Sequence, residues 1–368
     1  MLSFTYQEND KSLAALLPEK KLLAPDFNRD LNFYPGMETQ ILQAPDEFQF
    51  LHEAAVAEYH GTIFTAWYNC IEKELSGYTP IRGKRSADSG KTWSPVEIIA
   101  EDPERKLLYC PPVFGICKDV LYLLINTMVE FDRIHSLDIY RYEESSAKFC
   151  RIKSLSLPFK LNTNVYSLPN GKLFLPGRTG ELDQLPEIPA VLISDSGKID
   201  SDWRIVPMQK DHLKPDGTVF VFPETSSIVH GEEIWTFCRN DGSVPLLYVS
   251  TDCGENWTLY SHDIPFEDTK IYSGTLSDGR DYVIGNLQSG ESRSRLAIFF
   301  TEPHSKQFKN GALIQCGYDP ADPELPSRQW SYPACWEADG KLYVIYTKNK
   351  SHAMISILPL SCKKNNEP

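Results

Sequence analysis

Three short segments in the second half of the chain combine side chains that could act on an acidic ligand. Residues 222–239 contain Glu224 and Arg239, residues 286–296 contain a pair of arginines, and Tyr332 follows 108 residues after Glu224. An arginine suits a carboxylate because its planar guanidinium donates two parallel hydrogen bonds. A tyrosine can act as a nucleophile when a neighbouring carboxylate accepts its proton. These groups are distant in sequence, so only a fold that brings the segments together could use them jointly.

A repeated octapeptide is the strongest evidence for such a fold. Residues 86–93 (SADSGKTW) and 250–257 (STDCGENW) both fit S-x-D-x-G-x-[T/N]-W, and a degenerate copy occupies residues 194–197 with Trp203. The aspartate can bond the backbone of a tight turn, the glycine can adopt positive φ, and the tryptophan then returns to the hydrophobic layer. We call this turn an Asp-box. Its recurrence predicts equivalent turns in a repeated unit.

A second repeat alternates with the first and indicates the number of units. Apolar runs are joined by tight turns, five of which carry a glycine, at residues 61, 119, 171, 231, 279 and 340. An alternating strand follows each turn, as in a β-hairpin. The intervals suit blades of about four strands. The sequence therefore predicts an all-β fold, a six-bladed β-propeller.

The repeats leave little of the chain for another domain. Residues 46–368 are predicted to form the propeller, and residues 1–45 form an N-terminal extension that does not fit the repeat. We expect part of this extension to add a strand to the last blade, because closure of the ring protects the sheet edges. Helix is expected at most over residues 11–17.

Composition excludes several classes of partner. The formal net charge of −13 argues against nucleic acid or an anionic membrane as a ligand, although a local arginine cluster could still bind an acidic glycan. Neither a signal peptide nor a transmembrane run is expected, which favours a cytoplasmic location. The nine cysteines are scattered, so we expect reduced core thiols and no metal or cofactor. The oligomeric state is left open.

The Asp-boxes and the segments around Glu224, Arg239 and Tyr332 resemble the sialidase (neuraminidase) superfamily, whose blades carry bacterial-neuraminidase repeats. The resemblance covers roughly residues 50–358. It implies that Tyr332 is the nucleophile and that Glu224 is its base. A neutral phenol suits this role because the carboxylate of a sialic acid would repel a carboxylate nucleophile.

The same resemblance assigns the groups that bind the substrate carboxylate. It implies that Arg239 and Arg293 form the clamp, with Arg295 as the alternative to Arg293. The chain departs from the family pattern at His52, which stands where another clamp arginine is expected. His52 could assist the clamp, or it could titrate or abstract a proton.

A second departure concerns the proton donor. The family has an aspartate on the loop of the first blade, whereas this chain offers Glu74, with Glu72 as the alternative. With Glu74 as the general acid, the resemblance implies a retaining exo-glycosidase acting on a terminal acidic sugar such as a sialic acid.

Two other functions remain open at this point. One is a lyase or other hydrolase acting on uronate-bearing oligosaccharides, with His52 as base and Tyr332 as acid. The other is a non-catalytic glycan-binding propeller, because a fold does not fix a function. In all three cases the expected partner is a carbohydrate.

Overall fold

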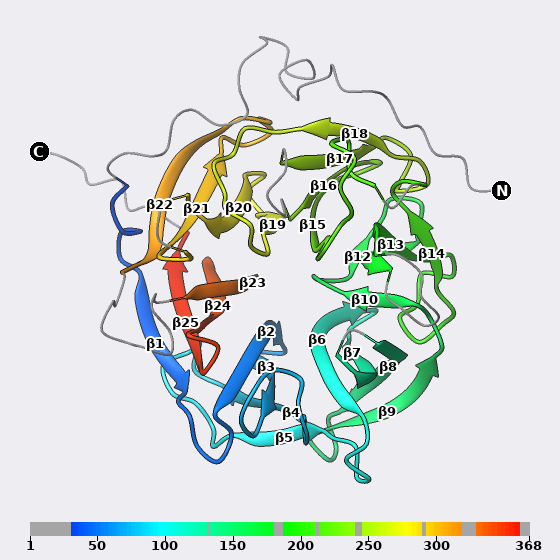
Figure 1. The fold of residues 1–368 in the computed structure, drawn as a ribbon. Coiled ribbons are helices and arrows are strands. Elements are labelled where there is room, and N and C mark those ends of the chain that lie inside the picture. The colour runs from blue at the N-terminus through cyan, green and yellow to red at the C-terminus, as the bar shows by residue number, and fades with distance from the viewer. Residues whose placement is uncertain are drawn as a thin grey trace, which may run out of the picture.

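Six β-sheets surround one axis in the computed structural model, which we describe for residues 31–131, 133–179, 187–210, 213–239, 245–288, 292–317 and 329–360. Within these ranges the regular elements are all strands, and Figure 1 shows them arranged as a ring. The predicted six-bladed propeller is therefore confirmed. The helix expected over residues 11–17 lies outside the described residues, as do the first 30 residues of the predicted extension.

The first three blades follow the order of the chain, and each strand pairs antiparallel with its neighbours. Blade one contains β2 (Phe50–Tyr59), β3 (Thr62–Cys70), β4 (Ile81–Ser86) and β5 (Glu97–Ala100). Blade two contains β6 (Leu108–Cys117), β7 (Val120–Glu130), β8 (Arg133–Glu143) and β9 (Lys148–Leu155). Blade three contains β10 (Phe159–Leu161), β11 (Tyr166–Ser167), β12 (Leu173–Thr179), β13 (Pro189–Ser194) and β14 (Arg204–Pro207).

The remaining blades continue the ring, and the last one closes it. Blade four contains β15 (Thr225–His230), β16 (Glu233–Cys238), β17 (Leu246–Ser250) and β18 (Thr258–Ser261). Blade five contains β19 (Tyr272–Thr275), β20 (Asp281–Asn286), β21 (Arg295–Thr301) and β22 (Phe308–Cys316). Blade six contains β23 (Trp330–Ala338), β24 (Lys341–Lys348), β25 (His352–Pro359) and β1 (Glu38–Gln43). The outer strand of blade six thus comes from the N-terminal side of the chain.

Blade three departs from the expected four strands because its innermost strand is divided. Both β10 and β11 pair with β12, and residues 162–165 separate them. Two asparagines in this gap bond to other blades instead of continuing the ladder. Asn162 Oδ1 accepts from the backbone N of Thr225 at 3.1 Å, and Asn164 Nδ2 donates to the hydroxyl of Tyr272 at 2.5 Å.

The two predicted turn repeats occupy equivalent places in their blades. Each of the six hairpin turns joins the first and second strands, and the glycines at 61, 171, 231, 279 and 340 all have positive φ. The sixth turn uses Lys118 and Asp119, with φ of +50° and +57°. Asp88 and Asp252 lie in the turns between the third and fourth strands of blades one and four, as predicted.

The two complete Asp-boxes have the same hydrogen bonds. Oδ1 of Asp88 accepts from the backbone N of Thr92 at 2.8 Å, and Oδ1 of Asp252 accepts from the backbone N of Asn256 at 2.9 Å. The tryptophans differ, because Trp257 is buried whereas Trp93 is only half-buried. Trp93 instead donates its indole N–H to Gln40 Oε1 at 3.1 Å.

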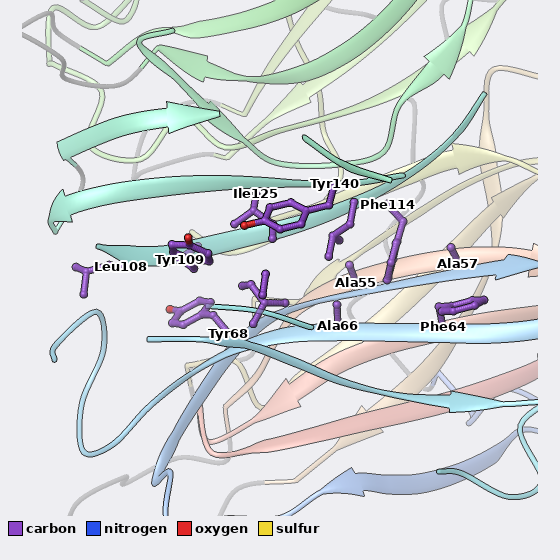
Figure 2. Close-up of a cluster of buried hydrophobic side chains, with 14 of the residues drawn as sticks. Ala55, Ala57, Phe64, Ala66, Tyr68, Leu108, Tyr109, Phe114, Ile125 and Tyr140 are labelled. Carbon is purple, nitrogen blue, oxygen red and sulfur yellow. The ribbon is translucent and has the colours of Figure 1, made fainter. Parts of the chain in front are cut away.

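The hydrophobic core lies between neighbouring blades. Figure 2 shows one such layer, in which Ala55, Phe64 and Tyr68 of blade one face Phe114 and Tyr140 of blade two. Similar buried clusters fill the other interfaces between blades. Because this packing fixes each blade against the next, the first residues of the innermost strands are held at fixed positions around the axis.

Candidate active site at the propeller axis

The innermost strands of three blades are irregular near their first residues. The pairing register shifts after His52 in β2, after Tyr109 in β6 and after Ser331 in β23. Two residues at these bulges, Glu53 and Tyr332, have φ of +44° and +57°. Positive φ costs a residue with a Cβ atom about 1–3 kcal/mol and is concentrated at functional sites. A bulge interrupts the alternation of side chains between the two faces of a strand. At one end of the axis, these three strands can therefore direct side chains away from the face that regular pairing would give them.

Tyr332 and Glu224 meet at this end of the propeller. The Tyr332 hydroxyl donates to Glu224 Oε2 at 3.1 Å, which joins blade six to blade four. Nη1 of Arg239 lies 2.9 Å from the same carboxylate oxygen and 3.2 Å from the Tyr332 hydroxyl. The backbone N of Arg239 also donates to the carbonyl of Glu224 at 2.8 Å. The structure therefore brings these three predicted residues together.

The charges around the pair keep its proton on the tyrosine. Burial opposes the ionisation of Glu224, but Arg239, Arg178 and Lys270 outweigh it and hold its pKa below the usual value. Burial and the charge of Glu224 raise the pKa of Tyr332 well above 10, against the opposing effect of Arg239 and Arg293. The resting site thus contains an ionised Glu224 that accepts a hydrogen bond from a neutral phenol.

Arg178 is a second arginine beside Glu224 that the sequence did not indicate. It lies in β12, and its Nη1 is 3.6 Å from Glu224 Oε1 while its Nε is 3.3 Å from Glu187 Oε2. The guanidinium carbons of Arg178 and Arg239 lie 5.8 and 5.2 Å from the centre of the Phe222 ring. Two arginines and one aromatic ring therefore enclose the carboxylate of Glu224.

Blade five contributes two cations that lie near the ring of Tyr332. The guanidinium carbon of Arg293 lies 5.7 Å from the centre of the Tyr332 ring, and Nζ of Lys270 lies 5.2 Å from it. Nη1 of Arg293 is buried and has no hydrogen-bond partner among the described residues. Arg295 begins β21 and pairs with Cys316 in the ladder. Of the two predicted alternatives, Arg293 is thus the one that contacts the ring of Tyr332.

His52 packs directly against Tyr332, with 4.1 Å between the ring centres. Nδ1 of His52 lies 2.9 Å from the hydroxyl oxygen of Thr347, which lies 3.2 Å from the carbonyl oxygen of Ser331. Nε2 of His52 is buried and has no hydrogen-bond partner among the described residues.

The imidazole of His52 is neutral, which differs from the expectation of a titrating group beside the clamp. Burial lowers its pKa well below 6.5, and the nearby charges of Lys350, Arg293, Lys270 and Arg239 act in the same direction. A cationic His52 would therefore be opposed by desolvation and by four positive charges. A neutral imidazole therefore cannot replace the positive charge of a clamp arginine at this position.

Glu74, the predicted proton donor, bonds to other residues than the members of this cluster. Its Oε2 pairs with Lys350 Nζ at 2.7 Å, and its Oε1 accepts from the Tyr68 hydroxyl at 3.3 Å. In the described part of the chain it has no hydrogen bond with Glu224 or Tyr332. Its alternative, Glu72, is exposed on the same loop.

A different carboxylate of blade one lies closer to the nucleophile. Glu53 is buried, and its Oε2 accepts from Lys270 Nζ at 2.9 Å, while its Oε1 is 3.6 Å from the thiol sulfur of Cys110. Lys270 in turn lies against the Tyr332 ring. Glu53 is therefore linked to Tyr332 through one side chain.

Three residues of the site could not be found from family resemblance, although the blade repeat contains a signal for them. Glu53 stands near the start of its innermost strand as Tyr332 does, Lys270 shortly precedes β19, and Arg178 is near the end of a second strand as Arg239 is. Charged residues at equivalent ends of equivalent strands meet at one end of the axis. Aligning the blades on their hairpin turns places Glu53 at the level of Tyr332 and Arg178 close to the level of Arg239.

The described residues contain no group of three His, Cys, Asp or Glu side chains that could hold a metal ion. Within the same ranges, no helix has the length and apolar character needed to span a membrane.

Comparisons with known proteins agree with the architecture. The family model described as BNR repeat-like domain matches residues 61–344. No curated protein matches the chain in sequence. Similarity to solved structures is extensive in shape but low in sequence.

Three solved structures illustrate this similarity. A Trypanosoma rangeli sialidase in complex with 2,3-difluorosialic acid, titled a covalent intermediate, has a TM-score of 0.67 at 13% identity over 90% of this chain and 60% of its own. A protein of unknown function from Dyadobacter fermentans has a TM-score of 0.70 at 14% identity, over 89% of this chain and 100% of its own. The Hadza microbial sialidase Hz136 has a TM-score of 0.66 at 12% identity, over 86% and 66%. The chain spans about three fifths of the length of the trypanosomal sialidases.

Proposed function

This chain belongs to the family of BNR repeat-like domain proteins, and from that membership and the geometry of its axial site we propose that it is a retaining exo-glycosidase of sialidase type. The substrate we propose is a glycoside with a terminal acidic sugar, such as a sialic acid. The observation that carries the proposal is the contact among Tyr332, Glu224 and Arg239 at one end of the axis. A phenol next to an ionised carboxylate is what a tyrosine nucleophile requires.

The proposed reaction begins when the Tyr332 hydroxyl oxygen attacks the anomeric carbon and Glu224 accepts the phenolic proton. Glu224 is buried and Tyr332 is half-buried, and the 3.1 Å hydrogen bond between them gives this proton a short path. A general acid protonates the leaving oxygen, and water later releases the sugar from Tyr332. For the acid, the sequence favours Glu74.

The substrate carboxylate would bind on the cationic side of Tyr332. Arg239 and Arg293 are the proposed clamp, and the unpartnered Nη1 of Arg293 offers a donor that the described residues leave free. The crystallised T. rangeli sialidase carries a sialic acid derivative as a covalent intermediate, which supports a carbohydrate ligand by analogy. Because His52 is neutral, the clamp here has fewer charges from blade one than the family pattern implies.

One observation favours a lyase as the second candidate. His52 is neutral, its Nε2 has no hydrogen-bond partner among the described residues, and its ring centre lies 4.1 Å from that of Tyr332. In a lyase acting on a uronate-bearing oligosaccharide, Nε2 would take the proton from the carbon next to the carboxylate. Tyr332 would then protonate the leaving oxygen while a carbon–carbon double bond forms.

A panel of fluorogenic sialosides and uronosides tests both proposals. We expect release of the fluorophore from a sialoside, with a free sialic acid as the second product and no unsaturated sugar that absorbs in the ultraviolet. An absorbing unsaturated product from a uronoside would favour the lyase. If no compound is turned over and glycans bind without reaction, the function is glycan binding.

A further inference from the structure

Blade one carries a buried carboxylate that resembles the nucleophile in its backbone geometry. Glu53 and Tyr332 both occupy bulges of innermost strands, and both have the positive φ that side chains with a Cβ atom avoid. A bulge redirects a side chain, and a strained one is retained where the redirected side chain is needed. Tyr332 is redirected to Glu224, and Glu53 is redirected to Lys270.

The contacts of Lys270 bring this carboxylate to the nucleophile. Its Nζ donates to Glu53 Oε2 at 2.9 Å and lies 5.2 Å from the centre of the Tyr332 ring. Both Glu53 and Lys270 are buried, and charged residues are rarely buried this deeply without a specific reason. In retaining glycosidases the acid/base and the nucleophile lie roughly 5–5.5 Å apart when both are carboxylates, so the acid is expected beside the nucleophile.

Glu74 also pairs with a lysine, but it is more exposed than Glu53 and its lysine lies over a different ring. It is half-buried on the loop after β3, and its partner Lys350 lies over the ring of Phe50 at 5.9 Å. Its remaining described hydrogen bond is with Tyr68. This ion pair connects the β3–β4 loop to the β24–β25 turn.

From this geometry we propose that Glu53, held by Lys270, is the general acid and base of the axial site. The proposal rests on the glycosidase function proposed above. In the first step the proton shared by Lys270 Nζ and Glu53 passes through Glu53 to the glycosidic oxygen as its bond to the anomeric carbon breaks. Tyr332 forms its bond to that carbon, and its phenolic proton passes to Glu224.

The second step restores every group. Glu53 takes a proton from water, the water oxygen bonds to the anomeric carbon, and the bond to Tyr332 breaks. The proton on Glu224 then returns to the Tyr332 oxygen, and the Lys270–Glu53 pair has regained the proton that it gave to the leaving group. No co-reactant besides water is consumed.

Leaving-group dependence separates Glu53 from Glu74. The variants Glu53→Gln and Glu74→Gln are compared on 4-nitrophenyl N-acetylneuraminide, whose leaving group needs little protonation, and on sialyllactose, whose leaving group needs a full proton. We expect Glu53→Gln to lose about 10²–10⁴-fold in kcat/KM on sialyllactose and less than about tenfold on the aryl sialoside. Glu74→Gln should change both values by the same factor.

Three results would overturn the assignment. If Glu74→Gln shows the selective loss and Glu53→Gln does not, the acid is Glu74. If both variants lose activity on both substrates equally, neither residue is the acid. If the unmodified protein turns over neither substrate, the glycosidase function itself fails, and the assignment falls with it.

Lys270→Met provides a second measurement should Glu53→Gln fail to fold, which its melting temperature would show. The groups around Glu53 are Lys270 before β19, Cys110 of β6, Tyr68 of β3 and Tyr332 of β23. Loss of the Lys270 ammonium removes the donor that bonds Glu53, so Lys270→Met should lower kcat/KM on sialyllactose by a larger factor than on the aryl sialoside. Equal losses on the two substrates in the folded variant would contradict the role of Glu53.

Discussion

Arg178 and Arg239 approach the same carboxylate from neighbouring blades. Their Nη1 atoms lie 3.6 and 2.9 Å from the two oxygens of Glu224, and their guanidinium groups lie over the same Phe222 ring. Two cations around one buried carboxylate keep Glu224 ionised, so it can accept a proton when Tyr332 attacks. The pair also means that Glu224 balances charge in addition to any catalytic role.

Conservative changes at Tyr332 and Glu224 should therefore have different effects on stability. We expect Tyr332→Phe and Glu224→Gln each to lower kcat by about 10²–10⁴-fold on a sialoside. Only Glu224→Gln should also lower the melting temperature clearly, because it removes a buried negative charge that lies beside both Arg178 and Arg239. Steady-state kinetics and thermal unfolding of both variants test this prediction. Equal melting temperatures of the two variants would contradict the conclusion that Glu224 balances the charges of both arginines.

The two arginines of the segment before β21 should be distinguishable. Arg293 lies against Tyr332, so Arg293→Lys should lower kcat/KM by about 10-fold or more, because a lysine cannot donate two parallel bonds to a carboxylate. Arg295→Lys is the matched control and should change kcat/KM by less than about threefold. A larger loss in the control would transfer the clamp role to Arg295.

The fold could be predicted from the sequence because each blade repeats the same local chemistry. The Asp-box turns and the glycine hairpins are determined by a few adjacent residues, so they are visible without knowledge of distant contacts. The divided innermost strand of blade three was not predicted, since it depends on bonds from Asn162 and Asn164 to other blades. Hydrogen bonds between blades cannot be inferred from the pattern of adjacent residues in the sequence.

The site was predictable where a motif carried it and not elsewhere. Glu224, Arg239 and Tyr332 were identified from segments resembling a family, and the structure brings them into contact. Lys270 and Arg178 belong to no such segment, and their importance depends on which blade lies beside which. The neutral state of His52 is also a consequence of packing, because burial and cations from other blades produce it.

The protonation of His52 should not contribute to the pH dependence of activity around neutral pH. Its folded-state pKa lies well below 6.5, so the imidazole stays neutral while the pH changes from about 8 to 6. For the same reason the contribution of His52 to stability is complete above about pH 6.5 and is lost as the pH falls below that value, where only the unfolded chain takes up the proton. The kcat/KM profiles of the protein and of His52→Gln should therefore be parallel between pH 6 and 8. An inflection near pH 6.5 present only in the unmodified protein would refute this.

An arginine at position 52 should not restore a third clamp residue. His52→Arg places a charge where four cations already act and where the ring is 1% exposed, so we expect a lower melting temperature and reduced activity. Thermal unfolding with a sialoside assay measures both. Unchanged stability together with higher activity would indicate that the site can open at this position.

The two Asp-box tryptophans should differ in their contribution to stability. Trp257 is 2% exposed, so Trp257→Ala should cost about 3–5 kcal/mol. Trp93 is half-buried and packs at the interface with blade six, so Trp93→Ala should cost clearly less. Urea unfolding of both variants gives the two free energies, and equal losses would mean that exposure does not decide the effect.

The aspartate of the first Asp-box should make the protein more stable at neutral than at acidic pH. Hydrogen bonds from Thr92 lower the pKa of Asp88 from 3.8 to about 2. A carboxyl whose pKa is depressed on folding contributes stability that is complete above about pH 3.8 and is lost as the pH falls toward 2. The difference in melting temperature between the protein and Asp88→Asn should thus shrink over this interval, and Asp252→Asn should behave similarly because its turn has the same bonds. A difference that stays constant from pH 6 to 2 would show that the side-chain amide replaces the carboxylate fully, and that the turn depends on geometry instead of charge.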